Sequence, residues 1–206
     1  MPTTILISGA NRGLLYQSIS RNLGIHADRR LLTIIAGVRD VASSEKSLSS
    51  VKLGKGSKII TVKLDSADKT GAKVAVEELK TKHGITHLDV VIANAAIAKN
   101  LRTVLDSPSE DTPFQATWSL LDRVASPKFV VITSQLGSIT EIYNFPLPDA
   151  TYASSKAAIN FIARKLHFEH EKLLVVTISP GWVPTDMGNA GAAVFWLGRA
   201  PRHATG

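Results

Sequence analysis

The stretch Ile5–Gly13 reads ILISGANRG and joins an apolar run to a glycine-rich turn. The side chains of Ile5–Ser8 favour a buried strand. Gly9 and Gly13 permit a tight turn in which the backbone closely approaches a pyrophosphate, and the N-terminus of a following helix attracts anions. Helical spacing of apolar residues predicts that helix over Gly13–Leu23. As a lone motif the turn is weak support for a nucleotide site, so its context along the chain decides the interpretation.

The rest of the chain alternates between strand patterns and helix patterns. Apolar, β-branched runs predict five more strands, at Leu31–Val38, Lys58–Leu64, Leu88–Ala93, Phe129–Thr133 and Leu174–Ile178. These runs are near-continuous, as is typical of strands buried on both faces. Helical patterns lie at Lys69–His83 (with Val74, Val76 and Leu79 expected inward), Phe114–Val124 and Ala150–Glu171. Together they predict one α/β domain, residues 1–206, with a doubly wound parallel sheet and helices on both faces.

The composition excludes several classes of protein. The net charge is +7, but the 24 Lys and Arg residues are scattered without a basic run, so we expect no nucleic-acid partner. No apolar run approaches the ~20 residues of a membrane-spanning helix, and the first residues lack the pattern of a signal peptide. The chain has no Cys, which excludes disulfides and thiolate chemistry and fits a reducing compartment. We therefore expect a cytoplasmic protein that does not bind membranes.

Tyr152 and Lys156 form a Y-x-x-x-K unit near the start of the longest helical pattern. Side chains four residues apart on a helix project from one face. An ammonium beside a phenol favours the phenolate and lowers the phenol's pKa from about 10 towards working pH, so the pair is a candidate acid catalyst. The spacing by itself is common. Here it occurs together with Thr133-Ser134 at the end of one predicted strand and with PGWVPT at Pro180–Thr185 after another.

The order of these elements resembles the short-chain dehydrogenase/reductase family over about Thr3–Gly191. The glycine turn, the segment Asn94–Ala96 after the fourth strand, and the serine, tyrosine and lysine just described carry the resemblance. Within the family, the chain looks most like fungal ketoreductases of the norsolorinic-acid ketoreductase kind, in the stretches Ile5–Gly13, Ile35–Asp40 and Lys128–Ser134. The resemblance implies a Rossmann-like fold. It also implies an NADP(H)-dependent oxidoreductase that reduces the ketone of a small, aromatic or polyketide-like metabolite by hydride transfer.

The resemblance assigns a role to each matching residue. Tyr152 would donate and accept the proton, Lys156 would lower its pKa and bind the nicotinamide ribose, and Ser134 would hydrogen-bond the substrate carbonyl. Ser138 is an alternative serine, whose other interpretation is a turn residue. Thr185 would bind the nicotinamide carboxamide. The cofactor-binding residues implied are Gly9, Asn11, Arg12, Gly13, Leu14, Arg39, Asp65, Asn94, Tyr152, Lys156, Pro180, Gly181, Val183 and Thr185.

The cofactor preference depends on the residue after the second strand. Dinucleotide folds that prefer NAD usually carry an acidic residue near this strand end. Arg39 stands there instead and suits the 2′-phosphate of NADP, and Arg12 in the glycine turn supplies a second positive charge. Both arginines have the alternative interpretation of plain solvent-facing residues, and Asp40 beside Arg39 weakens the charge argument.

Other polar residues have two interpretations each. Asp65 after the third strand matches the family residue that contacts the adenine, a role that Ser66 could share. Asn94 after the fourth strand is expected both to hold the strand end by side-chain hydrogen bonds and to serve the cofactor. His167 and His170 lie late on the last helical pattern without a third ligand at suitable spacing, so we expect both to be solvated helix-end residues and not a metal site.

The chain departs from the family pattern in three places. Leu15 stands where relatives have a third glycine. Only about 34 residues separate Ala93 from Lys128, so no equivalent of the family's proton-relay Asn can be assigned. About 21 residues follow Thr185, too few for the usual last helix and seventh strand. We therefore expect six strands, and we leave homo-oligomerisation open because the usual interface helix is shortened. A second hypothesis remains: a catalytically impaired relative that acts as a binding or scaffold protein.

Overall fold

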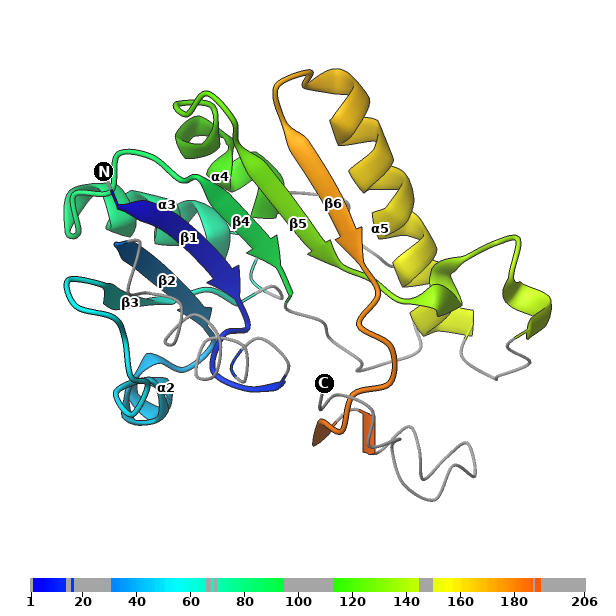
Figure 1. Ribbon diagram of the computed structural model, residues 1–206, viewed down its shortest axis with the longest axis horizontal. Coiled ribbons are helices and arrows are strands. Elements are labelled where there is room, and N and C mark those ends of the chain that lie inside the picture. Colours follow the sequence, from blue (N-terminus) through cyan, green and yellow to red (C-terminus); the bar gives the residue numbers. More distant parts are fainter. Residues whose placement is uncertain are drawn as a thin grey trace.

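The structure is a computed structural model and describes residues 2–13, 16, 31–65, 68, 70–94, 113–144, 150–186 and 188–189. Within these residues, six parallel strands form one sheet in the order β3-β2-β1-β4-β5-β6 (Figure 1). The order reverses between β1 and β4, which confirms the predicted doubly wound sheet. The strands are β1 Thr3–Ser8, β2 Leu32–Val38, β3 Lys58–Lys63, β4 Val90–Ala93, β5 Lys128–Ile132 and β6 Leu174–Ile178.

Helices pack on both faces of the sheet. They are α2 Val41–Leu48, α3 Gly71–Thr81, α4 Pro113–Leu121 and α5 Ala150–Glu169, with the short 3₁₀ helices η4 Gln135–Gly137 and η5 Ile142–Asn144. The larger apolar cluster joins the sheet to α3, α4 and α5, and a smaller cluster with Leu48 of α2 lies on the other face. Successive strand residues point to opposite faces, so Leu6 belongs to the first cluster and Ile5 and Ile7 to the second. Figure 1 shows α3, α4 and α5 together on one side of the sheet.

Most predicted elements that fall on described residues are present, with boundaries shifted by at most three residues. The helix α2 was not predicted, because its eight residues include three serines, which are weak helix formers. Its stability comes instead from its context. The Asp40 carboxylate accepts a hydrogen bond from the N–H of Ser43 at 3.3 Å and caps the helix, and Leu48 is buried.

Two expectations about burial are wrong. β2 is buried along its whole length, but in β6 Leu174 is 49% exposed and Ile178 is 42% exposed. β6 ends the described sheet, and only Val175, on the α5 side of the strand, packs against the larger cluster. In α3, Val74 was expected to point inward but is 62% exposed, and Ala75 takes the inward position.

A hollow of about 490 Å³ lies between α4 and α5. His170 borders it and rests on Trp118, with ring centroids 4.2 Å apart, so His170 is half-buried and not the solvated helix-end residue that was expected. In the part of the chain that the structure describes, no helix is long and apolar enough to cross a membrane. Among the same residues, no three His, Asp or Glu side chains gather as metal ligands.

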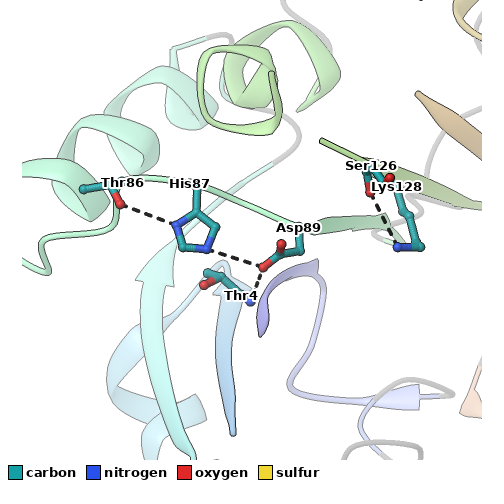
Figure 2. Close-up of polar contacts among 6 residues, drawn as sticks. All are labelled: Thr4, Thr86, His87, Asp89, Ser126 and Lys128. Carbon is teal, nitrogen blue, oxygen red and sulfur yellow. Dashed lines mark hydrogen bonds and ion pairs between the residues drawn. The ribbon is translucent and has the colours of Figure 1, made fainter. Parts of the chain in front are cut away.

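The amino-terminal edge of the sheet is tied together by one aspartate. Asp89 Oδ2 accepts a hydrogen bond from the N–H of Thr4 at 2.8 Å and lies 3.5 Å from Nε2 of His87. The main-chain carbonyl of Asp89 accepts from the N–H of Lys128 at 2.9 Å. Figure 2 shows these side chains, with Thr86 on the far side of the His87 ring. The contacts join β1, β4 and β5 at the edge opposite the carboxyl ends of the strands, so this cluster supports the sheet.

Candidate active site

The glycine turn leaves β1 at the carboxyl edge of the sheet. Gly9 and Gly13 have φ angles of 68° and 70°, a left-handed conformation that residues with a side chain rarely adopt. The N–H of Gly9 donates to the carbonyl of Gly37 in β2 at 2.8 Å. Asn11 and Arg12 lie between the two glycines, and Arg12 is exposed. The turn therefore has the sharp, open shape that the sequence predicts.

Asn94 fastens this turn to β4. Its N–H donates to Oγ of Ser8 at 3.0 Å, and its side-chain amide donates to the carbonyls of Ser8 at 3.1 Å and Gly9 at 3.3 Å. These bonds hold the ends of β1 and β4 together where the strand order reverses. The predicted strand-end role of Asn94 is confirmed, and this is the place where a doubly wound sheet forms its ligand crevice.

Arg39 follows β2 and is exposed. Asp40 comes directly after Arg39, but its carboxylate caps α2, which weakens the argument that it neutralises Arg39. A carboxylate is favourable at a helix N-terminus, and the carbonyl of Asp40 accepts from Oγ of Ser44 at 2.5 Å as well. No ion pair joins these two described residues, Arg39 and Asp40. A positive side chain therefore stands at the carboxyl end of β2, beside the glycine turn.

Tyr152 and Lys156 lie one turn apart on α5, as their spacing predicts. Nζ of Lys156 donates to the carbonyl oxygen of Ile132, the last residue of β5, at 2.9 Å, and lies 5.5 Å from the centroid of the Tyr152 ring. Burial of the ammonium lowers the pKa of Lys156 below its ordinary value. The cation is thus anchored at the carboxyl edge of the sheet, close to the phenol.

Ser134 follows β5 and begins η4. Its Oγ accepts a hydrogen bond from the N–H of Leu136 at 3.2 Å. That bond uses a lone pair, so the hydroxyl hydrogen of Ser134 can still be donated to a carbonyl oxygen. Ser138 ends the same short helix, and its Oγ accepts from the N–H of Glu141 at 3.3 Å. Ser138 therefore has the turn role that was its other interpretation.

The segment Pro180–Thr185 leaves β6 at the same edge of the sheet as the glycine turn (Figure 1). Oγ1 of Thr185 accepts from the N–H of Gly188 at 3.2 Å, and the indole N–H of Trp182 donates to the carbonyl of Gly188 at 3.0 Å. A methyl group on Gly13 would lie 4.0 Å from Cγ2 of Thr185. The fold thus brings Thr185 to the turn after β1, from the far end of the sequence.

A comparison of the sequence with known protein families agrees with this arrangement at the carboxyl edge of the sheet. A family model described as short chain dehydrogenase matches residues 3–193. The chain belongs to the short-chain dehydrogenase family. It is 40% identical to norsolorinic acid ketoreductase nor1 of Dothistroma septosporum, over 97% of this chain and 79% of that protein. It is 36% identical to the norsolorinic acid ketoreductase of Aspergillus parasiticus, over 97% of this chain and 78% of that protein. The predicted resemblance is confirmed.

Solved structures show the same fold. The NADPH-bound carbonyl reductase from chicken fatty liver has a TM-score of 0.70 and 25% identity, with 91% of this chain and 83% of that chain covered. Carbonyl reductase Sniffer of D. melanogaster has a TM-score of 0.72 and 21% identity, with 93% and 85% covered. The sheet order and flanking helices of this dehydrogenase are therefore those of a Rossmann-like short-chain dehydrogenase.

Some predicted features of the dehydrogenase lie outside the described residues. These are the cofactor contact of Leu14, the substitution at Leu15, the possible role of Ser66, most of the helix Gly13–Leu23 and the crossover over residues 95–112. Asp65 is described: it directly follows Leu64, whose N–H donates to the carbonyl of Val38 at 2.8 Å. This bond places Asp65 at the carboxyl edge, next to the end of β2.

Sequence reasoning missed how the dehydrogenase seats η4 on α5. A Cβ on Gly137 would lie 2.6 Å from the backbone carbonyl carbon of Lys156, so only glycine permits this approach. Asn160 forms hydrogen bonds with Thr133 and with Gly137. Its position four residues after Lys156, on the same helix face, was the one sequence signal that could have indicated a role.

Gly137→Ala is expected to destabilise the protein by about 1–3 kcal/mol, because the added methyl would push η4 away from the backbone of α5. Urea denaturation measures the loss. Gln135→Ala is the matched control, since Gln135 is exposed on the same short helix and its truncation should change stability by less than about 0.5 kcal/mol. Equal stability of the two variants would show that η4 does not need this close approach.

Proposed function

We propose that this dehydrogenase reduces a ketone of a small, aromatic or polyketide-like metabolite with NADPH as the cofactor. The observation that carries the proposal is the placement of Lys156. Its ammonium is anchored to the carbonyl of Ile132 at 2.9 Å and lies 5.5 Å from the centroid of the Tyr152 ring. The fungal relatives are named as norsolorinic acid ketoreductases, which supports a ketone as the substrate.

In the proposed mechanism two side chains act on the carbonyl oxygen, and a third acts on the acid that protonates it. Reduction adds a hydride to the carbonyl carbon and a proton to the oxygen, and bound NADPH supplies the hydride. Tyr152 donates the proton, Ser134 hydrogen-bonds the same oxygen, and the Lys156 ammonium stabilises the phenolate that remains. A proton taken up from solvent restores the phenol and closes the balance.

The described residues fit a phosphorylated dinucleotide. Gly9 and Gly13 leave the turn after β1 without a side chain at either end, which permits close approach of a pyrophosphate. The exposed Arg12 and Arg39 suit the 2′-phosphate, because guanidinium groups bind phosphate oxygens through charged hydrogen bonds. Thr185, which packs near Gly13, would hold the carboxamide of the nicotinamide. Tyr152 and Lys156 reach the same edge from α5.

Arg39→Asp is expected to weaken NADPH binding by about tenfold or more, with little effect on NADH, because one charged phosphate contact is worth about 1.5–3 kcal/mol. Calorimetric titration with both cofactors measures this. Arg123→Asp is the matched control: it makes the same charge change at the opposite edge of the sheet, in a hollow that Asp89 also lines. Equal affinity of the unmodified protein for the two cofactors would contradict the proposed preference, and so would equal weakening of NADPH binding in the two variants.

A panel of aromatic ketones with NADPH tests the proposed reaction, followed by the loss of NADPH absorbance. Turnover of at least one ketone supports the reductase. Tight NADPH binding without turnover of any ketone contradicts it, and supports the alternative of a catalytically impaired binding or scaffold protein.

We take the cytoplasm as the location, since the Cys-free sequence fits a reducing compartment.

A further inference from the structure

Asn160 joins α5 to both ends of the segment that carries Ser134. Its Oδ1 accepts a hydrogen bond from Oγ1 of Thr133 at 2.7 Å, and its Nδ2 donates to the carbonyl of Gly137 at 3.5 Å. Thr133 directly precedes Ser134, and Gly137 is the last residue of η4. One amide group, on the helix that carries Tyr152 and Lys156, thus holds the chain on both sides of the serine. We call these two hydrogen bonds the Asn160 bracket.

The surroundings make this bracket rigid. Thr133 is 8% exposed, and its N–H donates to the carbonyl of Ile178 in β6 at 2.8 Å. Lys156, one turn before Asn160, holds Ile132 by the bond from its ammonium at 2.9 Å. On the other side, Gly137 touches the backbone of α5 where no side chain would fit. Three successive anchors, at Ile132, Thr133 and Gly137, therefore lock the segment against α5.

The polarity of this contact points to a role in orientation. A segment could be packed on a helix by apolar side chains at lower cost, because the half-buried amide of Asn160 and the buried hydroxyl of Thr133 must give up bonds to water. A hydrogen bond between fixed groups adds direction, which apolar packing lacks. Direction matters for Ser134, since its hydroxyl and the phenol of Tyr152 must meet the same carbonyl oxygen.

We infer that Asn160 is a positioning residue, which sets the place of Ser134 relative to Tyr152 and Lys156 without touching the substrate. The inference rests on the proposed reductase function. Without the bracket, the segment keeps its anchor at Ile132 and Ser134 keeps its bond to the N–H of Leu136 at 3.2 Å, but the side-chain bonds at Thr133 and Gly137 are lost. A misplacement of about 1 Å at a reacting group costs up to about 100-fold in rate, so kcat should fall by about 10-fold to 100-fold.

Asn160→Leu removes both bonds at similar side-chain volume, and Thr133→Val removes only the hydroxyl. Each variant should lose kcat while the dissociation constant for NADPH, measured by calorimetry, stays within about twofold, because neither side chain is an expected cofactor contact and Lys156 keeps its own bond to Ile132. The double variant should lose no more than Asn160→Leu, because residues that act as a unit are not additive. Ser154→Ala is the matched control: Ser154 is exposed on the same helix, and within the described part of the chain its side chain bonds only to the carbonyl of Thr151 at 3.2 Å.

The outcomes separate this inference from the reaction on which it rests. Full kcat in folded Asn160→Leu or in Thr133→Val overturns the positioning role. A loss of kcat matched by an equal loss of NADPH binding and of melting temperature also overturns it, in favour of a purely structural contact. If Asn160→Leu does not fold, Thr133→Val decides by the same criteria. An unmodified protein that reduces no ketone contradicts the proposed function itself, and the inference falls with it.

Discussion

Tyr152→Phe is expected to lower kcat for ketone reduction by about 10²–10⁴-fold, the range that general acid catalysis contributes. The substitution keeps the ring and removes only the hydroxyl that would donate the proton. NADPH affinity should stay within a few-fold, since the anchored Lys156 and the glycine turn are unchanged. Initial rates of NADPH oxidation at saturating ketone, together with calorimetric titration of NADPH, measure the two effects separately.

Tyr143→Phe is the matched control for this substitution. Tyr143 lies on η5, in the connection that leads from β5 to α5, and is 91% exposed. The loss of its hydroxyl should leave kcat unchanged. Full activity of Tyr152→Phe would show that another group supplies the proton. An equal loss in both variants would show that the substitutions disturb the structure around the start of α5 and do not report the acid.

The unmodified enzyme should turn over slowly, since no equivalent of the family's proton-relay Asn can be assigned in the sequence.

Lys156→Met is expected to lower kcat by about 100-fold and to weaken NADPH binding by about tenfold or more. The first effect follows because no cation then stabilises the phenolate of Tyr152. The second follows because a charged hydrogen bond to a ribose hydroxyl is worth about 1.5–3 kcal/mol. Rates and calorimetric titration again separate the two. Unchanged kcat in the variant would contradict the assignment of Lys156.

The pH dependence of the rate gives Lys156→Met a second measurement. Burial lowers the pKa of the Lys156 ammonium, so the cation is lost at lower pH than on an exposed lysine. The rate of the unmodified enzyme should therefore fall as the solution becomes alkaline, starting below the ordinary lysine range near about 10.4. The variant has no ammonium at this position to lose, so its residual activity should not show this alkaline fall.

Lys165→Met is the matched control for both effects. Lys165 lies on the same helix, and its side chain is 61% exposed beside Glu169, with an N–O distance of 3.0 Å. An exposed ion pair of this kind contributes little to stability, and it lies in the last turns of α5, away from the carbonyl of Ile132. The rate, the NADPH affinity and the fall of the rate at alkaline pH should all match those of the unmodified protein. If the alkaline fall shifts in this control, it reports the overall charge of the helix and not the ammonium of Lys156.

The sequence by itself determined the fold class and the outline of the site. Near-continuous apolar runs separated by helical patterns predicted a parallel sheet, and the structure contains it. The Y-x-x-x-K spacing placed Tyr152 and Lys156 on one helix face, and the glycines of the turn have the predicted conformation. These features follow from periodicity and from backbone preferences, which act between residues close together in the chain.

Only the tertiary structure decided which distant residues support that outline. The bonds from Asn94 to Ser8 and Gly9 and the bracket of Asn160 around Ser134 both depend on contacts between separate elements. The exposure of β6 depends on its place at the end of the described sheet. Short polar side chains such as Asn carry no periodic signal of their own. Their partners are chosen by the way the strands and helices pack, because buried polar groups must find hydrogen bonds wherever the fold places them.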